Sequence, residues 1–249
     1  MIVYPNAKIN IGLNILNKRI DGYHELSSIF YPVPQLYDIL EIIPSDDFCF
    51  STSGISIPGQ DNICINAFKL LKEDFDINNV NIHLHKMIPI GAGLGGGSSD
   101  GAFTLKLLND IFDFNISNKE LERYALQLGA DCPFFIDNTP KSIMGIGDVM
   151  TSINLDLSMY NLKFVFPNLH ISTLDAFRYV TPREPEYDLL DIISSPIENW
   201  KGKVKNDFEV SVFQRYPELL EIKEKIYKNE AVYASMTGSG SAIYGFFLK

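Results

Sequence analysis

The sequence predicts an α+β protein of two domains, and three patterns along its 249 residues support that prediction. Strand signals follow one another in the N-terminal part, a glycine-rich loop runs into a helix in the middle, and a new strand-and-helix pattern begins after Leu155. We therefore place the domain boundary there, between residues 1–155 and residues 156–249. A chain of this length can bury a core without disulfides or a structural metal.

The composition excludes several classes of protein. Hydrophobic residues make up 46% of the chain and charged residues 21%, which excludes a disordered, collagenous or coiled-coil protein. The 21 basic and 31 acidic side chains give a formal net charge of -10. We therefore expect no nucleic-acid partner and no membrane partner, because both kinds of binding need a basic surface.

Cysteine usage and the N-terminus indicate a cytoplasmic protein. Cys49, Cys64 and Cys132 are widely spaced and form no CxxC pair, so the sequence predicts neither a disulfide framework nor a cysteine-rich zinc site. The first residues lack the basic start and apolar run of a signal peptide, and no stretch has the apolar length of a membrane span. We expect a soluble protein in a reducing compartment.

The first strand has the clearest pattern of the N-terminal elements. Apolar and polar residues alternate from Ala7 to Leu16, which predicts a half-buried strand with Lys8 and Asn10 on its polar face. The elements predicted after it are a turn at Asp21-Gly22, strands over 26–33 and 36–43, a helix capped by Asp61 that runs to about Phe75, and a strand over 80–88.

Helix signals dominate the middle of the chain. A helix follows the glycine-rich loop, and Ser117 and Glu120 have capping-box spacing for another helix that ends at Leu128 before Gly129. The remaining predicted elements are a strand interrupted by Gly145 and Gly147, a strand over 162–166, helices from about Thr173, over 207–215 and over 217–228, and strands over 231–236 and 242–248.

The glycine-rich loop is the strongest functional signal. Five glycines lie between Gly91 and Gly97 and are followed by Ser98, Ser99 and a helix. Glycine lets backbone N–H groups approach an anion, and a helix N-terminus adds free donors and a positive dipole end. The segment therefore predicts a phosphate site rather than a flexible turn.

Two common phosphate motifs do not account for this loop. A Walker A motif requires a lysine, which residues 89–100 lack. The glycines also match the dinucleotide pattern G-x-G-x-x-G, but the candidate ribose ligands Asp110 and Asp113 lie in or just past the following helix instead of after a second strand. An NAD-dependent oxidoreductase is therefore a weak alternative.

Three separated segments resemble the GHMP kinase superfamily, which includes galactokinase, homoserine kinase and mevalonate kinase. Residues 89–99 are similar to its phosphate-binding motif, residues 5–10 (PNAKIN) to its N-terminal motif, and residues 236–241 (MTGSGS) to its C-terminal glycine motif. The resemblance covers nearly the whole chain. It implies an N-terminal domain like domain 2 of ribosomal protein S5 and a C-terminal ferredoxin-like domain.

Two further segments narrow the resemblance within the superfamily. Residues 19–25 (RIDGYHE) and 129–135 (GADCPFF) resemble members that phosphorylate the 2-hydroxyl of a small cytidine diphosphate substrate in the non-mevalonate isoprenoid pathway. The cofactors implied are ATP and Mg²⁺. The chain departs from the family pattern at Gly101, where relatives usually carry alanine, and it is short in the C-terminal half.

The resemblance implies a role for each residue of the catalytic and nucleotide sites. Asp131 would accept the hydroxyl proton, and Lys8 would stabilise the transferring phosphoryl group and pair with Asp131. From the residues alone, a turn-capping aspartate is the favoured description of Asp131, and the resemblance reverses that preference. Asn62 is either an ordinary helix cap or a contact to the nucleotide base. The nucleotide-binding residues implied are Asn62, Pro89, Gly91, Gly93, Leu94, Gly95, Gly96, Gly97, Ser98 and Ser99, with the two serines also able to cap the helix.

The resemblance also implies a cytosine site. Tyr23 and His24 would stack on and hydrogen-bond to the base, and Phe177 would supply the second face of the stack. Lys86 is similar to a substrate-contacting lysine, although the alternation places it on the apolar side of its strand unless a bulge near Pro89 turns it. The substrate-binding residues implied are Asn10, Tyr23, His24, Lys86, Thr173, Phe177, Gly238, Ser239 and Gly240.

Other functions remain open at this point. One is a GHMP kinase for another small alcohol, of the homoserine or mevalonate type. Another is a non-catalytic nucleotide-binding relative, which is disfavoured because Lys8 and Asp131 are both present. His83 and His85 share a strand face, but no third ligand accompanies them at a useful spacing, so we interpret them as a polar sheet face and expect no protein-built metal site.

Overall fold

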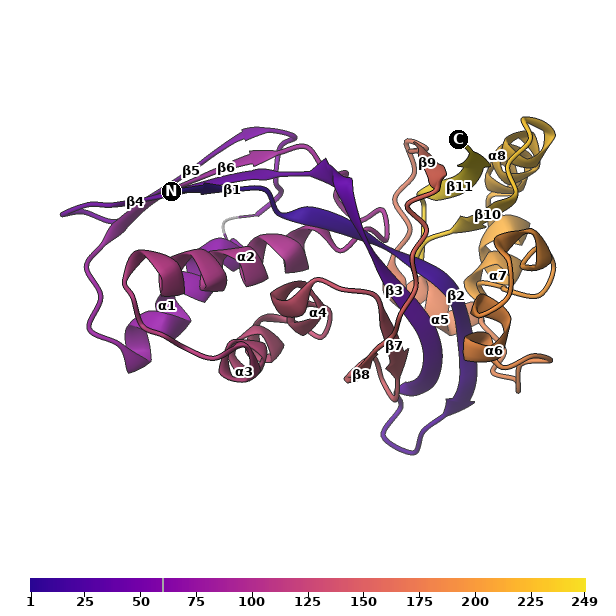
Figure 1. The fold of residues 1–249 in the computed structure, drawn as a ribbon, viewed down its shortest axis with the longest axis horizontal. Helices are drawn as coiled ribbons and strands as arrows, with labels where there is room; N and C mark the ends of the chain where they lie inside the picture. The colour runs from indigo at the N-terminus through magenta and orange to yellow at the C-terminus, as the bar shows by residue number, and fades with distance from the viewer. Residues whose placement is uncertain (60) are drawn as a thin grey trace. The chain divides into compact units, whose positions relative to one another are not determined.

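The computed structural model of the protein describes residues 1–59 and 61–249 (Figure 1). The chain forms two compact units, each made of several segments. The first unit comprises Met1–Lys8, Pro32–Ile90 and Gly95–Thr139, and the second comprises Ile9–Tyr31, Gly91–Leu94 and Pro140–Lys249. Both units contain helices and strands, which confirms the α+β prediction. The domain boundary after Leu155 stays a prediction.

The sheet of the first unit has the strand order β1-β4-β6-β5. Its strands are β1 (Ile2–Val3), β4 (Ile39–Pro44), β6 (Val80–Lys86) and β5 (Cys49–Gly54), all antiparallel to their neighbours except β5, which is parallel to β6. One face is apolar and buried, and includes Leu40 and Leu84. On the other face, His83 and His85 hydrogen-bond to serines of β5, as residues of a polar sheet face do.

Helices cover the apolar face of this sheet. The helices of this unit are α1 (Ile63–Asp74), α2 (Gly96–Ile111), α3 (Asn118–Leu128) and α4 (Cys132–Asp137). Figure 1 shows α1 and α2 along the sheet, where α1 packs on α2, while α3 and α4 pack on one another and on the other helices. The predicted cap of α3 is confirmed, because the backbone N–H of Glu120 donates to Ser117 Oγ at 3.3 Å. The sequence analysis missed α4, which is too short for a helical period to show.

Two details of α1 and α2 differ from expectation. Asn62, and not Asp61, caps α1, because Asn62 Oδ1 accepts a hydrogen bond from the Cys64 backbone N–H at 2.9 Å. Gly101 on α2 lies against α1, and a Cβ at this position would be 2.8 Å from Ile63 Cγ1. The glycine thus permits the close approach of the two helices. This packing offsets the lower helix propensity of glycine, which costs up to about 1 kcal/mol relative to alanine.

The second unit holds most of a sheet with the order β2-β3-β7-β8. Its strands are β2 (Asn6–Lys18), β3 (His24–Tyr37), β7 (Lys141–Met144) and β8 (Val149–Ser152). The prediction that Gly145 and Gly147 interrupt a single strand is wrong. They lie in the turn between the antiparallel strands β7 and β8, with φ of 67° and 103°. Positive φ is accessible to glycine at little cost, which explains both residues.

The prediction that β2 is half-buried is wrong. Every residue from Asn6 to Ile15 is buried, including the polar residues Lys8, Asn10 and Asn14. A polar group is buried at little cost only where it is hydrogen-bonded or paired. The polar residues of β2 therefore mark positions of specific interaction rather than a solvated face.

A second sheet and several helices complete this unit. The sheet has the order β10-β11-β9, with β10 (Tyr233–Met236), β11 (Ile243–Leu248) and β9 (Tyr160–Val165) all antiparallel. The predicted helices α5 (Thr173–Tyr179), α7 (Phe208–Arg215) and α8 (Pro217–Lys228) are present, together with the unpredicted short helices α6 (Leu189–Ile193) and η1 (Ile197–Asn199). Buried residues of α7, α8, β10 and β11 form one hydrophobic cluster. No helix in the described ranges has the length and apolar character needed to cross a membrane.

Candidate active site

The first part of the glycine-rich loop belongs to the second unit and meets the C-terminal glycine motif there. Gly93 has φ of 77°, and a Cβ on it would lie 2.1 Å from the carbonyl oxygen of Thr237. Thr237 Oγ1 donates a hydrogen bond to the carbonyl oxygen of Gly93 at 2.9 Å. Only glycine permits this approach of two backbones. Gly91, with φ of 69°, and Leu94, which is buried, flank the contact.

The second part of the loop belongs to the first unit and starts α2. Gly95 is the N-cap residue with φ of 68°, and Gly96 to Ser99 form the first turn of the helix. The expectation that Ser98 or Ser99 caps α2 is wrong, because both lie inside the helix and the cap is a glycine without a side chain. The N–H groups of a first helical turn have no intrahelical acceptor and are available to an anion.

The start of α2 is open at Gly97. This glycine is exposed, and a Cβ on it would have no neighbour within 4 Å among the described residues. At Ser99, by contrast, the side-chain hydroxyl is buried and has no hydrogen-bond partner in the described part of the chain. Pro89, half-buried, precedes the loop.

Lys8 and Asp131 form an ion pair beside this loop. Lys8 Nζ lies 3.4 Å from Asp131 Oδ2, and the side chains are 5% and 34% exposed. Asp131 is the residue before α4, yet its side chain makes no capping hydrogen bond to that helix. The turn-capping interpretation is therefore wrong. A Cβ on Gly95 would be 3.0 Å from Lys8 Cγ, so the stem of Lys8 packs directly against the N-cap of α2.

Lys86 is buried in ion pairs with two aspartates. It ends β6 with 3% of its surface exposed, and its ammonium group binds Asp38 Oδ2 and Asp100 Oδ2, the latter at 2.7 Å. Burial lowers the pKa of Lys86, but the two carboxylates, Asp100 first, outweigh burial, so that its pKa is raised. The strand alternation is correct here, because Lys86 lies on the buried side of β6, and the substrate contact that the resemblance implies for it stays a prediction.

The nucleotide-base role of Asn62 stays a prediction. Its side chain is 8% exposed and caps α1, which accounts for Oδ1. The ordinary cap, one of the two interpretations of this residue, is confirmed.

The expected cytosine site brings two rings of the second unit into contact. The rings of His24 and Phe177 stack with centroids 5.1 Å apart and an angle of 24° between their planes. Burial, followed by the charge of Lys18, lowers the pKa of His24, so the ring is neutral at neutral pH. Phe177 also meets Phe208 edge to face. Tyr23 is 62% exposed beside the stack. The rings touch one another, so a base can lie between them only after they separate.

Asn10 and Thr237 are linked instead of facing a ligand together with Lys8. The Asn10 backbone N–H donates to Thr237 Oγ1 at 3.0 Å, and the Asn10 backbone carbonyl accepts from Tyr244 OH at 2.8 Å. The side-chain amide of Asn10 donates to Ser28 Oγ at 2.9 Å. Asn10 is 3% exposed. These hydrogen bonds give Asn10 a structural role, and the substrate contact expected of it stays a prediction.

The C-terminal glycine motif continues past Thr237 through Gly238, Ser239 and Gly240. Gly238 and Gly240 have φ of 55° and 90°, and both are buried. Ser239 Oγ lies 3.2 Å from Thr173 Oγ1 at the start of α5, which joins two of the residues expected to bind substrate.

The start of α7 holds this motif in place, which the sequence analysis missed. Asn206 Nδ2 donates to the carbonyl oxygens of Met236 and Gly238 at 2.9 and 2.8 Å. Glu209 Oε1 accepts from the Met236 backbone N–H at 2.8 Å. An Asn-Asp pair with a glutamate shortly after it is the composition of an ordinary helix start, so the sequence held no signal that separates this role from capping.

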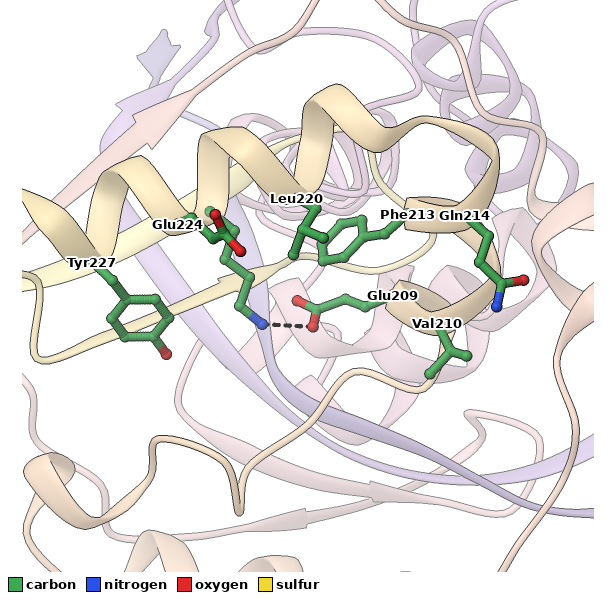
Figure 2. A pocket seen from close by; sticks show the side chains of 8 residues that line it. Glu209, Val210, Phe213, Gln214, Leu220, Glu224 and Tyr227 are labelled. Carbon is green, nitrogen blue, oxygen red and sulfur yellow. Dashed lines mark hydrogen bonds and ion pairs between the residues drawn. The ribbon is translucent and has the colours of Figure 1, made fainter.

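A groove of about 460 Å³ lies between α7 and α8 (Figure 2). Figure 2 shows Phe213 and Leu220 facing one another across it, and the ion pair of Glu209 and Lys223, at 2.6 Å, lies within it. Its lining includes none of the residues that the sequence predicts for the site.

Known proteins resemble this chain in sequence and in fold. The family model described as the GHMP kinases N terminal domain matches residues 62–150, and the model described as GHMP kinases C terminal matches residues 194–249. A protein of Azobacteroides pseudotrichonymphae called 4-diphosphocytidyl-2-C-methyl-D-erythritol kinase is 49% identical, over 100% of this chain and 94% of its own length.

Solved structures show the same fold. A crystal structure of 4-(cytidine 5'-diphospho)-2C-methyl-D-erythritol kinase superimposes with a TM-score of 0.84 at 31% identity, covering 98% of this chain and 89% of the other. A homoserine kinase from Cytophaga hutchinsonii, at 15% identity, gives a TM-score of 0.72 over 98% of this chain and 86% of its own, and shows the shared fold alone. With two matching family models and a full-length relative of this identity, the chain belongs to the GHMP kinase family, whose members are ATP-dependent phosphotransferases.

Proposed function

We propose that this chain is a 4-diphosphocytidyl-2-C-methyl-D-erythritol kinase. It transfers the γ-phosphoryl group of ATP to the 2-hydroxyl of that substrate and releases ADP. The names of the relatives similar over the full chain support this substrate, as do the segments RIDGYHE and GADCPFF. Within the family, the relative that is 49% identical to this chain is a stronger guide to the substrate than the homoserine kinase, which shares the fold at 15% sequence identity.

The observation that carries the proposal is the pair of Lys8 and Asp131. The Asp131 carboxylate is 34% exposed, makes no capping bond and lies 3.4 Å from a buried ammonium, which supports a role as the acceptor of a proton from a bound hydroxyl. Lys8 orients this carboxylate, and its ammonium offsets negative charge that develops during transfer. Because phosphoryl transfer needs alignment more than covalent chemistry, these two side chains and the loop supply most of what the reaction requires.

The start of α2 fits the phosphates of ATP. Gly95 has a positive φ and caps α2 without a side chain, and a Cβ on Gly97 would meet nothing within 4 Å among the described residues, so the N–H groups of the first turn are accessible to phosphate. We propose that Pro89, Gly91, Gly93 to Gly97, Ser98 and Ser99 receive the phosphates, and that Asn62 contacts the base.

Mg²⁺ accompanies ATP in this proposal and neutralises phosphate charge when it is bound. No cluster of three His, Cys, Asp or Glu side chains suited to a metal ion occurs in the described residues. Most ligands of the ion would therefore be phosphate oxygens and water, which is the usual coordination of Mg²⁺ in kinases.

The substrate site that we propose lies in the second unit. His24 and Phe177 separate to receive cytosine, Tyr23 covers the base from the exposed side, and Thr173 with Gly238, Ser239 and Gly240 contacts the diphosphate or sugar. The stack of His24 and Phe177 and the contact of Thr173 with Ser239 support this set.

Two broader predictions belong to the proposal. We keep the domain boundary after Leu155, with residues 156–249 as the C-terminal kinase domain. We also propose a cytoplasmic enzyme, which the three free cysteines support, because oxidising compartments favour disulfides.

A substrate panel tests the proposed function. Purified protein with ATP and Mg²⁺ is mixed with the cytidine diphosphate substrate, homoserine or mevalonate, and ADP release is followed. We expect turnover of the cytidine substrate only. Turnover of homoserine or mevalonate alone would show a GHMP kinase for another alcohol, and no turnover with any of them would show a non-catalytic relative.

A further inference from the structure

The first unit contains a buried charged cluster that the proposed reaction does not use. It consists of Asp38, Lys86 and Asp100, whose side chains are 0%, 4% and 2% exposed. Lys86 Nζ lies 2.5 Å from Asp38 Oδ2 and 2.7 Å from Asp100 Oδ2. Two carboxyl groups thus share one ammonium in a nearly solvent-free site, where an excess charge is costly.

The two carboxyl groups are satisfied to different extents. Asp38 Oδ1 accepts the backbone N–H groups of Met87 and Ile88 at 2.6 and 2.8 Å, and Oδ2 accepts from Lys86. Asp100 Oδ2 also accepts from Lys86, but Asp100 Oδ1 is buried and has no hydrogen-bond partner within the described residues. A buried oxygen without a hydrogen-bond donor costs more free energy when the carboxyl group is ionised than when it is protonated and neutral.

The charge of the cluster therefore depends on Asp100. Burial raises the pKa of Asp100 to about 8, with Lys86 opposing and Asp38 adding to the effect. The other titratable group that faces it is the Cys64 thiol of α1, whose own pKa burial raises strongly. With Asp100 neutral, Lys86 and Asp38 sum to zero charge; with Asp100 ionised, the cluster carries one negative charge.

The cluster lies beneath the start of α2. A Cβ on Gly96 would be 3.0 Å from Lys86 Nζ and 2.9 Å from Ile88 Cγ2. Asp38 Oδ1 accepts a hydrogen bond from the backbone N–H of Ile88, and Asp100 lies in the second turn of α2. An extra negative charge at this depth repels phosphates bound above it, because screening is weak in a buried site.

We propose that Asp100 is a positioning residue for the nucleotide, which binds to the loop while the cluster of Asp38, Lys86 and Asp100 is neutral. Where Asp100 is ionised, nucleotide binding takes up a proton at this carboxyl. The inference rests on the proposed function, since it requires nucleotide phosphates at the start of α2.

Proton linkage tests the inference. ADP binding is measured by calorimetry at pH 7, 8.5 and 9, in pairs of buffers with different ionisation enthalpies. If binding raises the pKa of Asp100 by about one unit, the wild type takes up roughly half a proton per ADP at pH 8.5 and binds ADP about fivefold more weakly at pH 9 than at pH 7. Asp100→Asn keeps the neutral shape and loses both effects.

Matched measurements separate the outcomes. Asp110→Asn, an exposed substitution on the same helix, should behave as the wild type. Absence of ADP binding to the wild type overturns the proposed function itself. Binding without proton uptake, or uptake that persists in Asp100→Asn, overturns only the role of Asp100. Should Asp100→Asn fail to fold, the ¹³C signal of the Asp100 carboxyl in the wild type decides: it must titrate near pH 8 and shift to higher pH with ADP.

Discussion

Replacing Gly97 with alanine tests whether the open start of α2 receives phosphate. A Cβ at this position meets nothing within 4 Å in the described structure, and Gly97 is not among the glycines with positive φ. The methyl group therefore fits the folded protein. Because alanine is favoured over glycine in a helix by up to about 1 kcal/mol, the variant should be at least as stable as the wild type.

The expected loss lies in nucleotide binding. If phosphate lies against the bare Cα of Gly97, the methyl group displaces it from at least one backbone N–H. A hydrogen bond to a charged group contributes about 1.5 to 3 kcal/mol, so the Kd for ATP should rise roughly 10- to 150-fold. The Tm should stay the same or rise by up to about 4 °C for a chain of this size.

Calorimetric titration with ATP and thermal unfolding measure the two quantities separately. Gly93→Ala is the matched contrast, because its Cβ would lie 2.1 Å from the Thr237 carbonyl oxygen, so it should lower the Tm as well as ATP affinity. A Gly97→Ala protein that binds ATP within threefold of the wild type would refute the placement of phosphate at this turn.

Three other substitutions test separate parts of the structure. Phe177→Ala removes the ring stacked on His24 and should weaken binding of the cytidine substrate by about 1 to 3 kcal/mol, which appears in steady-state kinetics as a higher KM for this substrate and an unchanged KM for ATP. An unaltered KM for the cytidine substrate would show that Phe177 has a purely structural role. The pKa of Asp100 is raised in the folded state, so the folded protein keeps a proton that the unfolded chain loses, and wild-type stability should fall as the pH rises from about 4 to about 8. The Tm of Asp100→Asn minus the Tm of the wild type should therefore increase between pH 5 and pH 8. A constant difference would contradict this expectation. Asn206→Ala removes the amide donor from the carbonyls of Met236 and Gly238, of which only Met236 keeps another donor among the described residues, Ser235 Oγ at 3.2 Å. The variant should lower stability by roughly 1 to 3 kcal/mol in urea unfolding, and an unchanged midpoint would contradict this expectation.

Helices of two turns or more could be predicted from the sequence, as could the seven-residue α5, whereas the shorter α4 and α6 could not. Helices α2, α3, α7 and α8 span two or more turns, so their apolar stripes and caps show in the sequence. Helices α4 and α6 are six and five residues long, which is less than two turns. Tertiary packing determines such helices, and a local pattern cannot reveal them.

Burial is the property that alternation misjudged. In β2 the polar residues alternate with apolar ones, which is the pattern of a half-solvated strand, but both sets are buried. The polar side chains are paired by residues that no local pattern links to them: Lys8 by Asp131, and the side-chain amide of Asn10 by Ser28. No local pattern shows which asparagine or lysine has such a partner.

The cluster around Lys86 shows the same limit in the candidate site. Its alternation correctly placed Lys86 on the buried side of β6, yet family resemblance alone suggested a ligand of the substrate. Asp38 lies 48 residues away from Lys86 and Asp100 lies 14 away, and neither has a motif that announces the contact. By contrast, the glycines of the phosphate loop are recognisable because positive φ and close backbone approach permit little else.

Single-turnover kinetics of Asp131→Asn test the catalytic pair most directly. The amide keeps the shape of the side chain and removes the basic oxygen next to Lys8. The rate of phosphoryl transfer should fall roughly 10²- to 10⁴-fold, the range for loss of a general base, while the Kd for ATP and the Tm stay near wild-type values. Asp137→Asn, an exposed substitution on α4, should keep the wild-type rate. A folded Asp131→Asn enzyme that transfers phosphate within a few-fold of the wild-type rate would contradict the proposed role of Asp131.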